Sequence, residues 1–243
     1  MLIIKLNATN STNSYLRKLC TQQPVEDYTT VITKNQTEGR GQMGAVWNSQ
    51  SSKNLTFSVY KELSEFKLEH PFYISIVVSL ALIKSLEFFS ISKLSIKWPN
   101  DILSENKKIC GILIENVIKQ NNLSYSIIGI GLNVNQTEFK NLPRASSLKL
   151  ISGKFFDLDE VANTIIENLK YYFNILERSD YDILMKTYES YLFRKNKPST
   201  FQDAEGLVFS GFIKSVTNSG SLQVLLEDEI IKEFDLKAIK LLY

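Results

Sequence analysis

The stretch Lys97-Trp98-Pro99-Asn100-Asp101 precedes the stretch Lys107-Lys108-Ile109-Cys110-Gly111-Ile112-Leu113-Ile114-Glu115. Together they have the pattern of a strand, a polar turn and a second strand. We therefore expect two antiparallel strands joined by Leu103-Ser104-Glu105-Asn106. Such a hairpin would bring Asn100 and Asp101, where the first strand ends, close to Lys108, where the second begins. A carboxylate, a nucleotide phosphate or a metal ion would each find partners at that end of the sheet.

The composition limits the class of protein to which the chain can belong. The 243 residues suffice for one large domain and a small one, and the 44% hydrophobic and 22% charged residues are those of an ordinary globular protein. A net charge of +2 without a basic run predicts no nucleic-acid binding. Two cysteines, Cys20 and Cys110, do not make a disulfide framework and predict a reducing, cytoplasmic location. The single histidine, His70, argues against a Ser-His-Asp triad and against a zinc site.

Hydrophobic periodicity predicts both helices and strands. The longest apolar segment, residues 71–89, is interrupted by Lys84 and Glu87, so we expect a buried helix and no membrane span. The strands that we expect cover residues 2–6, 29–34, 55–60, 94–98, 109–118 and 125–133, and the helices cover residues 12–20, 72–89, 158–176 and 181–192.

The composition changes at Arg194-Lys195-Asn196-Lys197-Pro198. Short alternating strands follow, with turns at Ala204-Glu205-Gly206 and Asn218-Ser219-Gly220. This pattern is typical of a small all-β barrel. We therefore expect one domain over residues 1–193 and a second over residues 196–243.

Three glycines and an arginine lie between two predicted strands, in Gly39-Arg40-Gly41-Gln42-Met43-Gly44. Glycines let backbone amides turn toward an anion, and Arg40 adds a planar cation suited to phosphate. The spacing of the glycines is that of neither a P-loop nor a dinucleotide-binding fingerprint. The segment could therefore also be an ordinary loop without a ligand. Trp47, just after this loop, could pack in the core or against a ligand.

Other candidate residues also allow two interpretations. Lys108 alone would be an exposed turn lysine, but Gly111 within an apolar strand indicates close approach of a ligand or another backbone. Asp101 could belong to an ordinary turn or hold a Mg²⁺ ion on a triphosphate. In Gly129-Ile130-Gly131-Leu132-Asn133, a buried asparagine needs hydrogen-bond partners, which a ureido or ribose group could supply.

The order and spacing of these motifs, together with Ser11-Thr12-Asn13, resemble those of the biotin–protein ligases. The resemblance covers nearly the whole chain. It implies an α+β fold in which a mixed, mainly antiparallel sheet with packed helices, the class II synthetase-like fold of biotin/lipoate ligases, precedes a small C-terminal SH3-like β-barrel.

The resemblance also implies which residues form the site. Those implied to bind biotin are Ser11, Thr12, Asn13, Gln36, Gly39, Arg40, Gly41, Lys108, Gly111 and Gly131. Those implied to bind ATP are Arg40, Gln42, Met43, Trp47, Asn100, Asp101, Lys108 and Asn133. Lys108 and Arg40 are the implied catalytic residues, and Asp101 is the implied ligand of Mg²⁺.

The activity implied is ATP-dependent formation of biotinyl-5′-AMP and transfer of biotin to a lysine of a carrier protein. The expected partner is the biotin carboxyl carrier domain of a carboxylase, with ATP and Mg²⁺ as co-substrate and activator. We expect no membrane or nucleic-acid partner, and either a monomer or a homodimer. Neither chemical step needs a covalent enzyme nucleophile, in keeping with the missing triad.

The sequence departs from the family in two places. The family's loop is often Gly-Arg-Gly-Arg-Arg-Gly, whereas Gln42 and Met43 replace two of its cations here. Ser11 lies too close to residue 1 to leave room for the helix-turn-helix domain of DNA-binding members, so we expect a ligase without repressor function. Two alternatives stay open: a lipoate or octanoate–protein ligase of the same fold, and a non-catalytic module that binds biotin.

Overall fold

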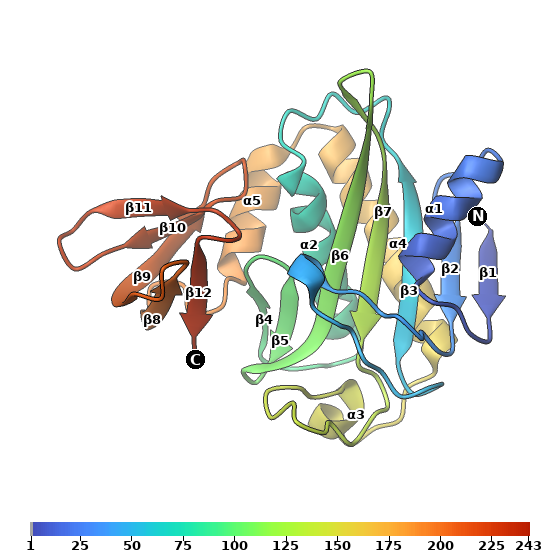
Figure 1. Ribbon diagram of the computed structural model, residues 1–243, viewed down its shortest axis with the longest axis horizontal. Coiled ribbons are helices and arrows are strands. Elements are labelled where there is room, and N and C mark those ends of the chain that lie inside the picture. Colours follow the sequence, from blue (N-terminus) through green and yellow to red (C-terminus); the bar gives the residue numbers. More distant parts are fainter. Residues whose placement is uncertain (1) are drawn as a thin grey trace.

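The computed structural model describes residues 2–243, which fold into two β-sheets and a set of helices (Figure 1). In chain order, the elements are β1 (Ile3–Leu6), α1 (Thr12–Gln22), β2 (Thr30–Thr33), the 3₁₀ turn η1 (Gln42–Gly44), β3 (Leu55–Glu62), α2 (Phe72–Phe88), β4 (Leu94–Lys97), β5 (Asp101–Ser104), β6 (Lys107–Lys119), β7 (Asn122–Leu132), α3 (Leu148–Ser152), α4 (Leu158–Glu177), α5 (Tyr181–Ser190), β8 (Pro198–Asp203), β9 (Val208–Val216), β10 (Leu222–Leu225), β11 (Ile231–Phe234) and β12 (Ile239–Leu242).

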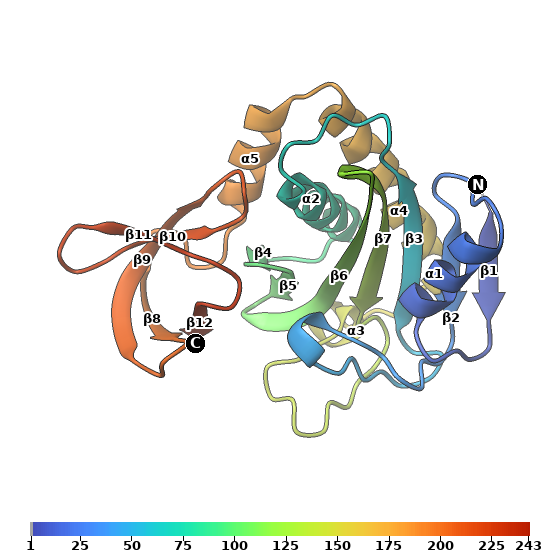
Figure 2. The same cartoon turned by 45° about the horizontal axis from the view of Figure 1, so that its top comes forward.

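The larger sheet has seven strands in the order β1-β2-β3-β7-β6-β5-β4, and only the β1–β2 pair is parallel. Helices α2 and α4 cover one face of it and α1 lies on the other (Figures 1 and 2). The expected α+β fold with a mixed, mainly antiparallel sheet is confirmed.

Both faces of β3 are buried, and its two faces differ in character. Phe57 packs with α2 and α4 in the main core, whereas Tyr60 packs in a second cluster with Leu16 of α1. Because side chains alternate along a strand, Thr56 and Ser58 share the α1 face with Tyr60. Two buried polar side chains thus lie on the face of β3 that α1 covers.

The predicted hairpin around Asp101 is wrong in its connectivity. Residues 101–104 form the additional strand β5, which pairs with β4 on one side and β6 on the other. Ile102 and Leu103 are fully buried, so this segment gains more as a strand than as a loop. The turn to β6 needs only Glu105 and Asn106, whose φ angles of 51° and 67° are those of a tight two-residue hairpin.

Helix α2 is the buried helix that the apolar segment predicts, and residues 76–83 within it are all buried. Among the described residues, 2–243, none of the helices combines the length and the apolarity that crossing a membrane requires. The short helix α3 was not predicted, because its five residues give no periodic signal.

The C-terminal strands form a separate antiparallel sheet in the order β11-β10-β9-β8-β12 (Figure 2). The strands pair as an open sheet with β11 and β12 at its edges. The hydrogen-bonded pairing among residues 196–243 does not join these two strands into the expected closed barrel. The indole Nε1 of Trp98 donates to the carbonyl of Gly220 at 2.9 Å and ties this sheet to the turn after β4. The division into domains at residues 193 and 196 stays a prediction.

Candidate active site

A cavity of about 270 Å³ is lined by residues of α1, of the segment around η1 and of strands β3, β5, β6 and β7. The structure brings most of the predicted site residues to this cavity. They are Ser11, Thr12, Asn13, Gln36, Arg40, Gly41, Gln42, Met43, Trp47, Asn100, Asp101, Lys108, Gly111 and Gly131. The cavity therefore gathers segments from Ser11 to Leu236, which are 225 residues apart in the chain.

Strand register explains the shape of the cavity floor. Thr56 pairs with Gly131, Gly131 with Gly111, and Gly111 with Asp101, which makes one row across four neighbouring strands. The indole of Trp47 lies over the two glycines: a Cβ atom built on Gly131 would come within 2.4 Å of its Cε2 atom. The indole fits there because residues 111 and 131 have no side chains.

The closed end of the cavity holds neutral amides and hydroxyls. The side-chain Oε1 of Gln36 accepts hydrogen bonds from the backbone N–H of Thr12 at 2.8 Å and from its hydroxyl at 3.2 Å. The hydroxyl of Ser58 lies within hydrogen-bond distance of the Thr12 hydroxyl, 2.7 Å, and of Asn13 Oδ1, 2.5 Å. Gln36 thereby holds the first turn of α1, and Ser58 joins that turn to β3.

Asn13 is held in one orientation. Its Nδ2 donates to Glu115 Oε2 at 2.9 Å and to the carbonyl of Leu113 at 3.3 Å. A Cβ atom on Gly129 would lie 2.4 Å from Asn13 Oδ1, so the glycine makes room for the amide. The amide oxygen, which points to Ser58, keeps a lone pair for a ligand.

The residues on the two sides of the glycine-rich loop hydrogen-bond to each other as in a short antiparallel ladder. Gly41 N–H donates to the carbonyl of Ala45 at 2.6 Å, and Trp47 N–H donates to that of Gly39 at 2.9 Å. Met43 adopts φ 55° at the tip and exposes 68% of its surface. Arg40 reaches back to α1 and β6, where its Nη2 lies 3.1 Å from Ser14 Oγ and 3.3 Å from Glu115 Oε1.

Charged side chains occupy the other end. Asp101 lies at the centre, with 2.6 Å between its Oδ1 and Lys108 Nζ and 3.6 Å between its Oδ2 and Lys97 Nζ. The predicted proximity of Asp101 and Lys108 is confirmed. Burial lowers the pKa of Lys97, as do the nearby cations Lys108 and Arg144, while Asp101 opposes the shift.

These residues do not fit a resident metal ion. Among residues 2–243, Asp101 is the only carboxylate on the cavity wall, and two ammonium groups already neutralise it. No cluster of three or more potential ligands exists within residues 2–243. Asn100, which adjoins Asp101, uses its side-chain Nδ2 to bind the carbonyl of Ile112 at 2.8 Å.

Two predicted residues do not reach the cavity. Gly39 lies against the backbone of Trp47, and a Cβ atom there would come 2.2 Å from the Trp47 carbonyl oxygen. Asn133 is buried, and its Nδ2 donates to the carbonyl of Ser146 at 3.0 Å. The buried asparagine does need partners, as predicted, but the protein itself provides them.

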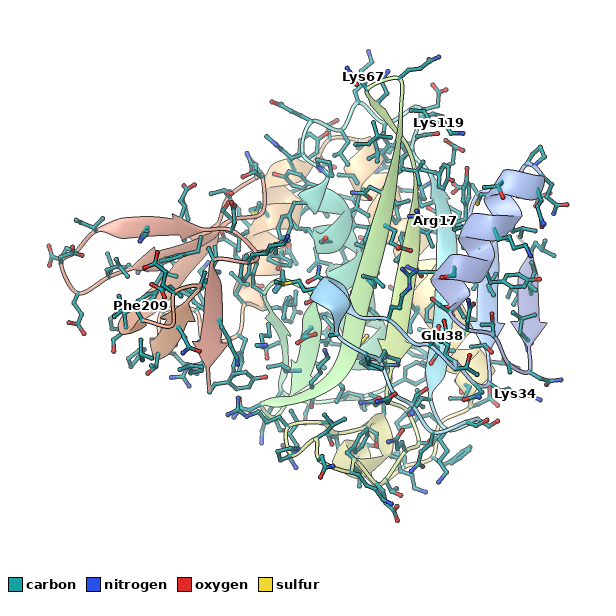
Figure 3. The ribbon with its side chains drawn as sticks, in the orientation of Figure 1. Arg17, Lys34, Glu38, Lys67, Lys119 and Phe209 are labelled. Carbon is teal, nitrogen blue, oxygen red and sulfur yellow. The ribbon has the colours of Figure 1, made fainter. Side chains whose placement is uncertain are left out.

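Sequence analysis missed Ser58 and Glu115. Ser58 shares one face of β3 with Thr56, opposite the apolar Phe57, and that alternation was the available signal. Glu115 ends the second quoted stretch, and its side chain contacts Asn13, Arg40 and the guanidinium of Arg17, the last at 3.8 Å. Figure 3 labels Arg17.

Comparisons with known proteins agree with this geometry. Residues 6–133 match the Biotin/lipoate A/B protein ligase family. The chain is 32% identical over 170 residues to the Bifunctional ligase/repressor BirA of Bacillus spizizenii, covering 68% of this chain and 51% of that protein. It is 28% identical over 165 residues to the Biotin--[acetyl-CoA-carboxylase] ligase of Mycobacterium tuberculosis, covering 67% and 60%. The chain thus matches about half the length of these curated relatives.

Solved structures extend the match to nearly every residue. The biotin protein ligase from Aquifex aeolicus in complex with biotin and ATP superposes with a TM-score of 0.83 at 27% identity, covering 99% of this chain and 98% of that one. With more than half of its residues matched by the family and the predicted motifs gathered around one cavity, this chain belongs to the biotin/lipoate A/B protein ligase family.

Proposed function

We propose that the chain is an ATP-dependent biotin–protein ligase that forms biotinyl-5′-AMP and transfers biotin to a lysine of a biotin carboxyl carrier domain. One observation carries the proposal: a single cavity has neutral amides and hydroxyls at one end, Lys108 at the other, and the glycine-rich loop along its wall. The similarity to a ligase structure that contains biotin and ATP supports it.

The neutral end suits the ureido ring of biotin. A ureido group carries one carbonyl acceptor flanked by two N–H donors. Thr12, Asn13 and Gln36 line this corner and offer hydroxyl and amide groups, both donors and acceptors, and Ser58 supports Thr12 and Asn13 from β3. A ring bound there would direct its acyl chain along Gly131 and Gly111 toward Lys108, because those glycines form the floor between the two ends.

The charged end suits the reacting groups. A carboxylate oxygen of biotin attacks the α-phosphorus of ATP, an O–P bond forms, and the bond to the leaving pyrophosphate breaks. Lys108 would stabilise the negative charge that builds up on the phosphoryl oxygens, which such electrostatic sites do by several kcal/mol. In the second step the amine of the carrier lysine attacks the acyl carbon, AMP leaves with the electron pair, and the amine loses a proton.

The loop residues Arg40, Gln42, Met43 and Trp47, with Asn100 and Asp101, are the residues that we propose surround ATP. Magnesium would arrive as part of the MgATP substrate, since one carboxylate between two lysines is not a site for a resident ion.

The test is pyrophosphate release measured with biotin, lipoate or octanoate as the acid. We expect release with ATP and biotin only, followed by transfer to a purified carrier domain. Release with lipoate or octanoate in preference to biotin would identify the alternative ligase. Biotin binding by calorimetry without any release would identify a non-catalytic module.

The proposal also covers the compartment and the oligomeric state of the enzyme. Cys20 and Cys110 are both free thiols, which supports the reducing cytoplasm as its compartment. We propose a monomer or a homodimer that acts without nucleic acid, and sedimentation of the purified chain would distinguish the two states.

A further inference from the structure

A second cavity, of about 300 Å³, adjoins the cavity of the candidate active site. Met43, Pro99 and Leu236 line both cavities, so they lie at the boundary between the two. Each comes from a different segment: Met43 from η1, Pro99 from the link between β4 and β5, and Leu236 from the turn between β11 and β12. That turn faces η1 in both views of the ribbon (Figures 1 and 2).

Two of these apolar side chains are largely in contact with water. Met43 exposes 68% of its surface and Leu236 exposes 44%. A single exposed apolar residue is ordinary on a protein surface, but here two of them, from distant segments, line the same opening. Closer contact between them would remove apolar surface from water and is therefore favourable.

Leu236 lies on a well-supported turn. Phe234, two residues earlier, is buried within the C-terminal sheet. The side chain of Asp235 accepts a hydrogen bond from the hydroxyl of Ser221 at 3.0 Å, and its carbonyl accepts one from the N–H of Ala238 at 2.9 Å. These contacts fix the turn on both sides of Leu236.

The C-terminal sheet is itself fixed to the rest of the protein. The hydroxyl of Tyr73 in α2 donates to Asn218 Oδ1 at 2.9 Å, and the Trp98 indole donates to the carbonyl of Gly220. The ring of Phe72 packs so closely on Gly220 that a Cβ atom there would lie 2.6 Å from it. Leu236 thus has a constant place beside the cavity.

Met43, in contrast, is at the unsupported tip of the glycine-rich loop. The ladder bonds between Gly41 and Ala45 and between Gly39 and Trp47 lie at the base of the loop. Met43 has a φ angle of 55°, in the left-handed region that favours glycine. The turn alone therefore does not explain a methionine at this position.

We propose that Met43, Pro99 and Leu236 form an apolar clasp, which closes the glycine-rich loop onto the C-terminal sheet when the cavity holds biotinyl-5′-AMP. The inference rests on the proposed function, because it assigns a role in holding the intermediate of that reaction. Leu236 is a positioning residue: it acts through the loop and not on the reacting atoms. Met43, where the family often has an arginine, contributes an apolar contact in place of a charge.

Cross-linking tests whether the two segments meet. A disulfide forms only when the two Cα atoms approach within about 7 Å. In a Cys20→Ser background, where the remaining Cys110 is fully buried, the pair Met43→Cys and Leu236→Cys should cross-link under mild oxidation. The control pair is Met43→Cys and Leu207→Cys, because Leu207 exposes 65% of its surface next to β9 and lines neither cavity. The control pair should stay reduced, and added biotinyl-5′-AMP should speed the cross-link of the first pair.

Release of preformed biotinyl-5′-AMP measures what the clasp contributes. Leu236→Asn should speed release about fivefold, the loss of one partly buried apolar contact. Leu236→Met keeps an apolar side chain and should restore the wild-type rate, and the matched control Leu207→Asn should not change it. Adding Met43→Gln to Leu236→Asn should speed release little further, because the partner is already lost.

The outcomes separate the clasp from the reaction. Equal release rates for Leu236→Asn and the wild type, or equal effects of Leu236→Asn and Leu207→Asn, would overturn the clasp while the proposed function stands. Failure of the first pair to cross-link would overturn it as well. If the first pair cross-links without ligand as described but ATP and biotin never give biotinyl-5′-AMP, the proposed function fails and the contact between the loop and the C-terminal sheet stands.

Discussion

Arg40 of the glycine-rich loop and Glu115 of β6 form an ion pair, with 3.3 Å between Arg40 Nη2 and Glu115 Oε1. The other oxygen of the same carboxylate accepts the hydrogen bond from Asn13. One carboxylate therefore joins the loop to the neutral end of the cavity, where we propose that biotin binds. A phosphate bound to Arg40, the only cation within residues 39–44, would have to compete with this carboxylate.

We expect Glu115→Gln to slow the dissociation of biotinyl-5′-AMP. A glutamine keeps an oxygen for Asn13 but no longer neutralises Arg40, which is then free for the phosphate. Partly exposed ion pairs of this kind are worth about 0.2–1 kcal/mol, so the rate should fall by a factor of up to about five. Arg17→Ala is the control, because it removes a cation 3.8 Å from the same carboxylate without touching Arg40. A faster rate for Glu115→Gln would contradict the competition.

We expect Lys108→Ala to abolish adenylate formation while the fold stays intact. The side chain is 36% exposed, and Lys97 remains beside Asp101, so little stability depends on it. Loss of a group aimed at developing charge lowers the rate about 10²–10³-fold. The neighbouring exposed Lys107 is the matched control as Lys107→Ala. A rate of biotinyl-5′-AMP formation equal to the wild type would make Lys108 a surface residue only.

Much of this site could be predicted because its residues occur in short motifs at strand ends and in one loop. Hydrophobic periodicity gave α2, α4 and the strands around Gly111 and Gly131 with small errors at their ends. Family resemblance then indicated which motifs meet. Neither source required knowledge of the register between strands.

The remaining features depend on that register. Whether Gly111 lies opposite Gly131, and Ser58 opposite Gly129, follows from pairing across distant strands, and a shift of one residue would turn every side chain to the other face. Asn133 was expected at ATP because the sequence does not tell which buried amide finds a partner within the protein. Strand β5 was missed because Asp101 and Ser104 give it the polar ends of a turn.

We expect Gly131→Ala to displace the indole of Trp47 and to weaken biotin binding. The added methyl group would lie 2.4 Å from Trp47 Cε2, too close for both to stay in place. Tryptophan emission should shift to longer wavelength, and the variant Trp47→Phe assigns that signal, because Trp98 is the only other tryptophan. Calorimetry should show roughly tenfold weaker biotin binding, in line with the 1–3 kcal/mol that overpacking costs.

A double variant tests the cause of that loss. In Trp47→Ala the space over Gly131 is open, so adding Gly131→Ala should cost little further affinity, and the two effects should not add. Additive effects would mean that the methyl group acts on the strand itself and not through the indole.

Few cations of the glycine-rich loop are available to retain the adenylate. Gln42 and Met43 stand where the family often has arginines, so Arg40 supplies the only side-chain cation there, and backbone amides supply the remainder. Charge-assisted hydrogen bonds contribute roughly 1.5–3 kcal/mol, so Arg40→Gly should speed the release of biotinyl-5′-AMP about tenfold to a hundredfold. The released adenylate should then label bystander lysines.

Gln42 lines the cavity, so Gln42→Arg places a second cation within reach and should slow release. The measurement is the dissociation rate of preformed adenylate, with Lys34→Ala, an exposed cation outside the cavity wall, as the control (Figure 3). Equal rates in the wild type, Arg40→Gly and Gln42→Arg would mean that a segment other than this loop retains the intermediate.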